Sequence, residues 1–244
     1  MVKLFIDGMS IEANDGITIL EAAKLAKVNI PTLCYLKEIN EIGACRICVV
    51  EVEGRDRLVA ACNTPIEEGM QVHTNSEKIR LARKTNLELI LSEHDCHCPT
   101  CIRSGNCKLQ TLAQEMNILD IPFEQKTAKN KWKASDILLR KDSKCIKCLR
   151  CVSVCDKVQG LGVWELRGNG AHANVVVRGG ANLSNICSLC GQCVTHCPVG
   201  ALSARDDTEK VFAAINNPEK IVVVQVAPAV RTAWCEGLGI APEA

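Results

Sequence analysis

Cysteine offers more chemistry than any other residue in this chain. Seventeen cysteines occur in 244 residues, and most of them fall into four groups. Such cysteines either form disulfides in secreted domains or bind metal in a reducing compartment. No secretory signal is visible at the N-terminus, where Lys3 and Asp7 interrupt any apolar run. We therefore expect a cytoplasmic protein whose clustered cysteines bind metal.

Two cysteine runs share one spacing. CIKCLRCVSVC and CSLCGQCVTHCP both contain C-x2-C-x2-C-x3-C, the pattern of bacterial ferredoxins with two [4Fe–4S] clusters. In that pattern the fourth cysteine of each run binds the cluster of the other run. The predicted ligand sets are Cys145, Cys148, Cys151 and Cys197 for one cluster, and Cys187, Cys190, Cys193 and Cys155 for the other. The first run has Asp156 where the second has Pro198, which loosens the match without removing a ligand.

The N-terminal cysteine group has the spacing C-x10-C-x2-C-x13-C. Its members are Cys34, Cys45, Cys48 and Cys62. Three of them lie on one loop and the fourth follows a later strand-like run. Plant-type [2Fe–2S] ferredoxins have this plan with a shorter first gap. A zinc ribbon would need two short C-x2-C knuckles, and only one is present, so the spacing favours a [2Fe–2S] cluster.

The stretch SEHDCHCPTCIRSGNCKLQ offers more ligands than the four that a cluster needs. The candidates are His94, Cys96, His97, Cys98, Cys101 and Cys107. Spacing alone leaves open an all-cysteine set with Cys96 and a set in which His94 takes its place. His97 directly precedes Cys98, which leaves no room for both to bind.

Local patterns predict the elements that position these ligands. A hairpin should turn at Asp7–Gly8, and the runs CVVEVEG and LVAAC should form strands. Helices are expected over residues 18–27, 74–94 and 108–117. The first two should begin with capping boxes, formed by Thr18 with Glu21 and by Thr74 with Glu77. Residues 162–177 predict a second hairpin, and residues 220–244 a strand followed by the start of a helix.

The composition of the chain, and the catalytic motifs that it lacks, limit the classes of function that the chain can have. The net charge is +1, so the whole molecule has no strong field for nucleic acid or a membrane. From Glu124 to Arg150, nine basic residues face three acidic ones, which predicts either a solvated linker or a docking face for an acidic ferredoxin. No dinucleotide fingerprint, P-loop, HEXXH or nucleophile elbow is visible. We therefore expect no catalytic residue here, and expect flavin and nicotinamide chemistry on a partner.

The order of the cysteine sites resembles a known arrangement. C-x10-C-x2-C-x13-C, H-x3-C-x2-C-x5-C and the twin runs together resemble the N-terminal electron-transfer region shared by the large iron–sulfur subunit of respiratory complex I and [FeFe]-hydrogenases. Related NAD-linked hydrogenase and formate dehydrogenase subunits also share it, and the resemblance covers essentially the whole chain. It implies that the middle site is a [4Fe–4S] cluster held by His94, Cys98, Cys101 and Cys107. Cys96 and Cys235 are then left as thiols without a ligand role.

The resemblance implies an α+β fold with several small domains. These are a β-grasp [2Fe–2S] ferredoxin domain at 1–77, a small helical His/Cys [4Fe–4S] domain at 78–120, a linker at 121–135, a bacterial two-[4Fe–4S] ferredoxin domain at 136–212, and a strand–helix segment at 213–244. The last segment is similar to the start of a hydrogenase catalytic domain. In that family the domain continues much further and supplies active-site cysteines, so we expect the hydrogen-activating site on another chain.

The implied function is electron relay in a cytoplasmic NAD(P)-linked hydrogenase, with the flavin-based electron-bifurcating kind among the candidates. The implied partners are an NAD(P)H-binding flavoprotein subunit, a small thioredoxin-like [2Fe–2S] subunit, a hydrogenase catalytic subunit and a soluble ferredoxin. Two alternatives stay open: the N-terminal part of an [FeFe]-hydrogenase without its catalytic domain, and the relay subunit of an NAD-dependent formate dehydrogenase. A zinc-binding interaction module is a different class, and the twin ferredoxin runs argue against it.

Overall fold

The fold is known from a computed structural model that describes residues 1–127 and 137–241. The chain divides into two compact units, Met1–Arg205 and Asp206–Ala244. Parts of the expected linker at 121–135 and of the basic stretch at 124–150 lie outside the described residues.

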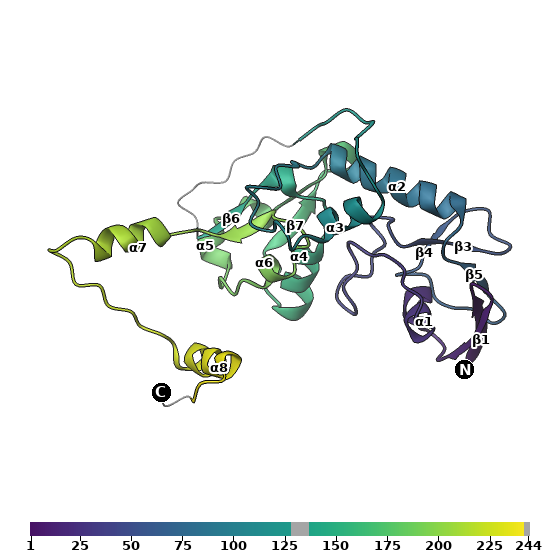
Figure 1. The fold of residues 1–244 in the computed structure, drawn as a ribbon, viewed down its shortest axis with the longest axis horizontal. Coiled ribbons are helices and arrows are strands. Elements are labelled where there is room, and N and C mark those ends of the chain that lie inside the picture. The colour runs from purple at the N-terminus through teal and green to yellow at the C-terminus, as the bar shows by residue number, and fades with distance from the viewer. Residues whose placement is uncertain (128–136, 242–244) are drawn as a thin grey trace. The chain divides into compact units, whose positions relative to one another are not determined.

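The N-terminal part of the first unit is a five-stranded sheet with helix α1 beside it (Figure 1). The strands are β1 (Val2–Ile6), β2 (Met9–Ala13), β3 (Val49–Val52), β4 (Val59–Ala60) and β5 (Gln71–His73), in the spatial order β2-β1-β5-β3-β4. β1 and β5 are parallel and the other neighbours are antiparallel. The predicted hairpin is confirmed, since Ile6 pairs with Met9 across Asp7–Gly8. Both turn residues have the positive φ that a two-residue hairpin requires.

Helix α1 (Ile19–Leu25) begins where the sequence predicts. The Thr18 hydroxyl accepts a hydrogen bond from the Glu21 N–H at 3.3 Å, which satisfies one free donor of the first turn. The Glu21 carboxylate binds Lys24 at 2.6 Å and the Tyr35 hydroxyl at 2.5 Å instead of returning to Thr18. The predicted capping box is therefore half formed.

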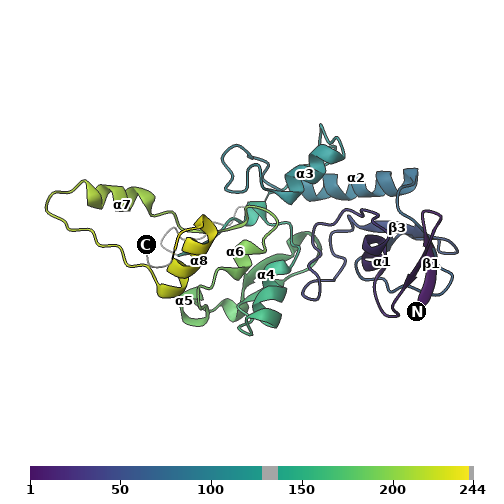
Figure 2. The same cartoon turned by 60° about the horizontal axis from the view of Figure 1, so that its bottom comes forward.

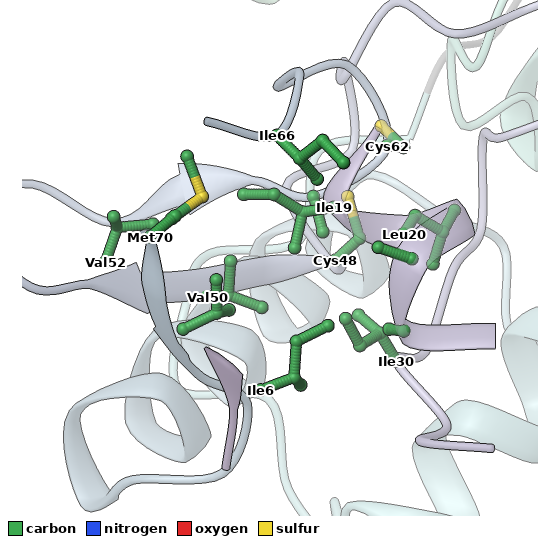
Figure 3. Close-up of a cluster of buried hydrophobic side chains, with 14 of the residues drawn as sticks. Ile6, Ile19, Leu20, Ile30, Cys48, Val50, Val52, Cys62, Ile66 and Met70 are labelled. Carbon is green, nitrogen blue, oxygen red and sulfur yellow. The ribbon is translucent and has the colours of Figure 1, made fainter. Parts of the chain in front are cut away.

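A core of buried apolar side chains lies between α1 and the sheet (Figure 3). It includes Ile19 and Leu20 from the helix and Ile6 and Val50 from the strands. Two of the predicted ligands, Cys48 and Cys62, belong to the same cluster of side chains. Packing holds these two thiols as firmly as any core residue.

Helix α2 (Glu77–Ser92) corrects one prediction. Its N-cap is Ser76, whose hydroxyl accepts from the Ile79 N–H at 3.2 Å, so Thr74 with Glu77 was the wrong capping box. The Asp7 carboxylate holds Thr74, accepting from its N–H at 2.8 Å and from its hydroxyl at 2.5 Å. Thr74 therefore donates its hydrogen bonds to Asp7 of the hairpin turn and does not cap the helix.

The remainder of the first unit consists of short elements. They are α3 (Lys108–Glu115), β6 (Leu138–Arg140), α4 (Arg150–Ser153), β7 (Trp164–Arg167), β8 (Asn174–Val177), α5 (Leu183–Ile186), α6 (Gln192–Thr195) and β9 (Leu202–Ala204). Helical turns also occur at Asp142–Lys144, Val154–Val158, Gly170–His172 and Arg178–Gly180. β6 pairs with β9, and β7 with β8, which confirms the predicted insert hairpin. Helices α4 and α6 lie side by side in both views (Figures 1 and 2).

A second core joins the three ligand-bearing regions of this unit. Leu33 and Ile47 come from the N-terminal cysteine loop, Leu87 from α2 and Leu109 from α3. The same cluster contains Trp164 and three of the ferredoxin-run cysteines, which are Cys155, Cys193 and Cys197. The cysteine sites are therefore parts of one packed body rather than separate modules.

The second unit contains α7 (Thr208–Ile215) and α8 (Pro228–Leu238). The helix predicted near the C-terminus is confirmed as α8, whereas the strand predicted before it is wrong. Residues 221–226 are extended but pair with no strand in the described part of the chain, and the exposed fraction of Ile221 is 94%. Neither this unit nor the rest of the described chain has a helix with the length and apolarity needed to span a bilayer.

Candidate iron–sulfur sites

The four N-terminal cysteines lie together around the loop that precedes β3. The Cys34 N–H donates to Cys45 Sγ at 3.4 Å, and a hydrogen bond from the Cys34 thiol lowers the pKa of Cys45 to about 6. A hydrogen bond from the Cys62 thiol likewise lowers the pKa of Cys48. Cys62 also feels the charges of Cys34 and Cys45, so the structure brings all four predicted residues into one group. The same hydrogen bonds raise the pKa of the donor thiols Cys34 and Cys62. Each pair therefore shares one proton, which has to be released before all four sulfurs can bind iron as thiolates.

The middle site lies between two helices. α2 ends at Ser92, two residues before His94, and Cys107 is the N-cap residue of α3. His94 is buried, and its Nδ1 atom has no hydrogen-bond partner among the described residues. Burial lowers the pKa of His94 to about 4, which keeps the imidazole neutral as metal ligation requires. An unpaired buried nitrogen is costly, and bonding to iron would satisfy it.

A cavity of about 460 Å³ adjoins His94. His94, Cys98 and Cys107 line it, and so does Cys96. The fourth predicted ligand, Cys101, is not among the lining residues and lies against Gly200. Cys96 is exposed, whereas His94 is buried, although both remain within reach of the cavity.

His97 does not join the residues of this cavity. Its side chain is exposed and its Nδ1 atom is paired with the Asp95 carboxylate. A hydrogen bond from His97 lowers the pKa of Asp95 to about 2. The His97 side chain is therefore paired with Asp95 and does not line the cavity of His94 and Cys98.

In the first ferredoxin run, the nearest thiol neighbours include a cysteine of the second run. Burial raises the pKa of Cys148 to about 12, and the charges of Cys197 and Cys145 add to this effect. Cys151 feels the charges of Cys148, Cys145 and Cys197 as well. The structure therefore groups Cys197 with the first three cysteines of the other run.

The reciprocal crossing is present in the second run. Burial raises the pKa of Cys193 to about 11, with smaller contributions from the charges of Cys187, Cys155 and Cys190. The same four thiol residues line a cavity of about 80 Å³. Cys155 is further oriented by the Val163 N–H, which donates to its Sγ at 3.3 Å.

The backbone of the two ferredoxin runs repeats one conformation. Lys147 and Leu149 in the first run have φ of 54° and 62°, and Leu189 and Gly191 at the equivalent positions have φ of 56° and 74°. Residues with a side chain rarely adopt this left-handed region, and such strain persists where the surroundings hold it. The two runs therefore share the same strained turns at equivalent positions, as two ligand loops for the same kind of cofactor would.

The predicted ligands are not arranged as they would be around a single metal ion. In the described ranges 1–127 and 137–241, no three His, Cys, Asp or Glu side chains converge on one metal position. The ligands of a cluster bind different iron atoms, so they need not converge on one point. The thiols of the N-terminal group and of the two ferredoxin sites contact one another in pairs, as ligands of one cluster would.

Three basic residues near the first ferredoxin run form ion pairs or hydrogen bonds with other residues of the fold. Arg140 is buried and paired with the Asp142 carboxylate, and Lys144 Nζ donates to the Asp95 carbonyl at 2.8 Å. Lys147 pairs with Glu93 at 2.6 Å. Arg140 and Lys144 are therefore buried and do not fit a solvated linker or a docking face, whereas the Lys147–Glu93 pair is partly exposed.

Sequence reasoning missed residues that connect the sites. Asn40 is fully buried, and its Nδ2 atom donates to the Cys34 carbonyl at 2.8 Å and to the Cys148 carbonyl at 3.0 Å. Arg150 donates to the carbonyls of Cys34 at 3.1 Å and of Tyr35 at 2.6 Å. No local pattern signals these contacts, since Asn40 and Cys148 are 108 positions apart.

Three family models match successive parts of the chain. A "2Fe-2S iron-sulfur cluster binding domain" matches residues 1–77, an "NADH-ubiquinone oxidoreductase-G iron-sulfur binding region" matches 83–122, and an "NADH-quinone oxidoreductase subunit 3, ferredoxin-like domain" matches 135–203. The expected α+β class, with a [2Fe–2S] ferredoxin domain followed by [4Fe–4S]-binding regions, is confirmed.

Several known proteins are similar to this chain. NADP-reducing hydrogenase subunit HndD of Solidesulfovibrio fructosivorans is 43% identical over 99% of this chain and 43% of the relative. NADPH-Fe(3+) oxidoreductase subunit alpha of Geobacter sulfurreducens is 37% identical over 84% of this chain and 24% of the relative. The chain thus spans less than half the length of these two curated relatives. A chain in the crystal structure of an NAD+-reducing [NiFe]-hydrogenase in its H2-reduced state is 32% identical, with a TM-score of 0.77 and coverage of 84% of this chain and 87% of the solved one.

The fold and these matches define an iron–sulfur protein with domains for both [2Fe–2S] and [4Fe–4S] clusters. The solved hydrogenase chain is matched over most of its own length. The chain therefore belongs to the family of iron–sulfur electron-transfer subunits shared by NAD(P)-linked hydrogenases and NADH-quinone oxidoreductases.

Proposed function

We propose that this chain holds one [2Fe–2S] and three [4Fe–4S] clusters, with the ligand sets predicted from sequence, and relays electrons within a cytoplasmic NAD(P)-linked hydrogenase. Such clusters supply one-electron chemistry, and plant-type [2Fe–2S] ferredoxins have potentials near about −400 mV. That range suits exchange with both reduced nicotinamide and hydrogen. The chain's own residues hold the clusters at fixed separations and bury several of their thiolates, among them those of Cys48, Cys62 and Cys148.

The observation that carries this proposal is the continuous contact between successive sites. Arg150, two residues after Cys148, donates to the carbonyl of Cys34 at 3.1 Å. On the other side, the Cys107 thiol lies 3.8 Å from the carbonyl of Pro198, the residue after Cys197. The site of Cys148 and Cys197 therefore adjoins both the N-terminal site and the middle site. The crossed positions of Cys155 and Cys197 connect it to the remaining ferredoxin site.

Other subunits are needed to complete a reaction. We propose an NAD(P)H-binding flavoprotein, a small thioredoxin-like [2Fe–2S] subunit and a hydrogenase catalytic subunit as partners, with a soluble ferredoxin as a further electron donor or acceptor. The similarity to HndD, a subunit of an NADP-reducing hydrogenase, and to the NAD+-reducing [NiFe]-hydrogenase supports a nicotinamide at one end and hydrogen at the other. The finer form of this proposal is flavin-based electron bifurcation at the flavoprotein subunit.

A second candidate is that this array is one part of a longer hydrogenase polypeptide. The match to HndD favours it, because it takes in 99% of this chain but only 43% of the relative. The apolar side chains of 221–226 would then be covered by the following domain, whereas in the first candidate a partner subunit covers them. Mass measurement of the protein isolated from its native source separates the two candidates.

The proposal is tested on protein purified without oxygen. Iron and acid-labile sulfide should each be present at about 14 atoms per chain, the amount that one [2Fe–2S] and three [4Fe–4S] clusters contain. Dithionite should produce several distinct reduced-cluster signals in electron paramagnetic resonance (EPR). NADH should reduce the clusters only after a flavoprotein subunit is added. Zinc in place of iron and sulfide would contradict the cluster assignment. Hydrogen evolution by the 244-residue chain alone, with iron fully accounted for, would contradict the relay assignment.

A further inference from the structure

One asparagine touches two ligand residues that belong to different predicted clusters. Asn40 has an exposed fraction of 0%, and it belongs to the N-terminal cysteine loop, where its side chain faces the first ferredoxin run. Its Nδ2 atom donates to the Cys34 carbonyl at 2.8 Å and to the Cys148 carbonyl at 3.0 Å. Both hydrogens of the amide are therefore used, one for each ligand residue.

Asn40 is held in this orientation by its own partners. Ser153 of α4 donates through its hydroxyl to Asn40 Oδ1 at 2.7 Å, which fixes which end of the amide faces the carbonyls. The Asn40 backbone also exchanges both of its hydrogen bonds with Leu36, with N–O distances of 2.7 and 3.0 Å. Arg150 adds a second link between the same two regions through the Cys34 carbonyl.

The chemistry of the position admits few substitutes. An aspartate has the same shape but no N–H to donate, so its oxygens would face two carbonyl oxygens. A leucine fills similar space and would leave both buried carbonyls without this donor. The position therefore requires a side chain with two hydrogen-bond donors, one for each carbonyl. Packing of apolar side chains would not impose this requirement.

We propose that Asn40 is a positioning residue that couples the [2Fe–2S] site to the [4Fe–4S] site of Cys148 for electron transfer, an inference that rests on the proposed relay function. Between the two ligand thiolates, the path consists of covalent bonds within Cys34 and Cys148 and two hydrogen bonds through one nitrogen. Electron transfer between cofactors weakens steeply with distance and with gaps in the bonded path. Asn40 removes such a gap and fixes the separation of the two sites.

The test uses the cluster-loaded full-length protein and three variants. Asn40→Leu and Asn40→Asp both remove the two donors, one with an apolar and one with a polar replacement. Asn86→Leu is the matched control, because Asn86 Nδ2 donates at 3.0 Å to the Arg46 carbonyl in the same ligand loop but reaches no second site. The readouts are the EPR spin–spin interaction between the two reduced clusters, and the rate of electron redistribution between them after flash reduction.

Both Asn40 variants should weaken the spin–spin interaction, without abolishing it because Arg150 still links the two regions, and should redistribute electrons more slowly, with iron content and the two midpoint potentials close to wild type. The potentials should hold because Asn40 bonds carbonyls and not cluster sulfurs. Asn86→Leu should match wild type. The inference would be overturned if Asn86→Leu weakened the spin–spin interaction as much as the Asn40 variants do. It would also be overturned if both Asn40 variants kept the wild-type interaction and the wild-type rate of electron redistribution.

A milder variant keeps the test decisive if the Asn40 variants fail to assemble. Ser153→Ala removes only the hydroxyl that orients the amide, and it should reduce the coupling in the same direction with all clusters retained. Wild-type coupling in Ser153→Ala would then overturn the inference. Failure of the proposed function is distinct from either result, because the wild-type protein itself would lack the two reduced-cluster signals.

Discussion

Gly200 lies against the Cys101 thiol so closely that a methyl group on its Cα would come within 2.5 Å of Sγ. The same methyl group would approach Ile102 Cγ1 at 3.6 Å and Lys144 Cδ at 3.8 Å. Gly200 follows Cys197 by three residues, so this contact joins the middle site to the ferredoxin sites. The missing side chain is what allows the two ligand loops to pack together.

Gly200→Ala should therefore displace Cys101 and perturb the middle cluster. Overpacking of this kind costs about 1–3 kcal/mol, and Sγ cannot move without leaving its ligand position. We expect loss or altered g-values of one [4Fe–4S] signal, while the [2Fe–2S] signal stays unchanged. Gly237→Ala is the control, since a methyl group there meets nothing within 4 Å and its φ is ordinary. An unaltered middle-site signal in Gly200→Ala would show that Cys101 is not a ligand.

The choice between His94 and Cys96 can be made by substitution. His94→Ala should lose the middle cluster, because it removes a buried and otherwise unpaired ring nitrogen. Cys96→Ser should keep it and change the free energy of unfolding by no more than about 0.5 kcal/mol, as is usual at an exposed position. Iron content and EPR of the two variants decide the matter. The reverse outcome, with the cluster lost in Cys96→Ser and kept in His94→Ala, would exchange the two assignments.

The histidine should also set the potential of that cluster. Replacing a neutral imidazole by a thiolate adds one negative charge to the ligand shell, which disfavours the reduced state, as the comparison of Rieske and all-cysteine centres illustrates. His94→Cys should therefore keep the iron and lower the midpoint potential. A redox titration followed by EPR measures the shift, and a higher potential in the variant would contradict histidine ligation.

Sequence spacing was sufficient to predict which cysteines gather in the N-terminal group and in the two ferredoxin runs, but not the arrangement of the middle site or what holds the sites together. The repeated C-x2-C-x2-C-x3-C runs led to the crossed neighbours Cys155 and Cys197, because a short local pattern encodes a ligand loop. Asn40 and Gly200 could not be predicted in this way, since their partners lie far away in the sequence. The Thr74 cap failed for the same reason: a distant carboxylate, Asp7, competed for its hydrogen bonds.

The strand expected at 221–226 illustrates a further limit. A run of β-branched residues shows that a segment can be extended, but a strand also needs a neighbour to complete its backbone hydrogen bonds. The described part of the chain supplies none, so the segment stays extended and unpaired.

Crossed ligation makes a directional prediction for the ferredoxin sites. Cys155 belongs to the first run but lines a cavity with Cys187, Cys190 and Cys193. Cys155→Ala should therefore damage the cluster of the second run first. Cys197→Ala is the reciprocal control and should damage the cluster of Cys145, Cys148 and Cys151. EPR of each variant distinguishes the two clusters, and damage confined to a residue's own run would reject the crossing.

The last prediction concerns a protein shortened to residues 1–205. All predicted ligands lie in this unit, which packs as a compact body by itself, whereas neither α7 nor α8 buries a residue. Apolar side chains of the second unit are widely exposed, with exposed fractions of 82% for Val223 and 63% for Trp234. Large exposed apolar surface promotes association, so its removal should reduce aggregation. We expect the shortened protein to retain the iron content, EPR signals and unfolding midpoint of the full chain. Loss of any cluster signal on truncation would show that residues 206–244 contribute to a site.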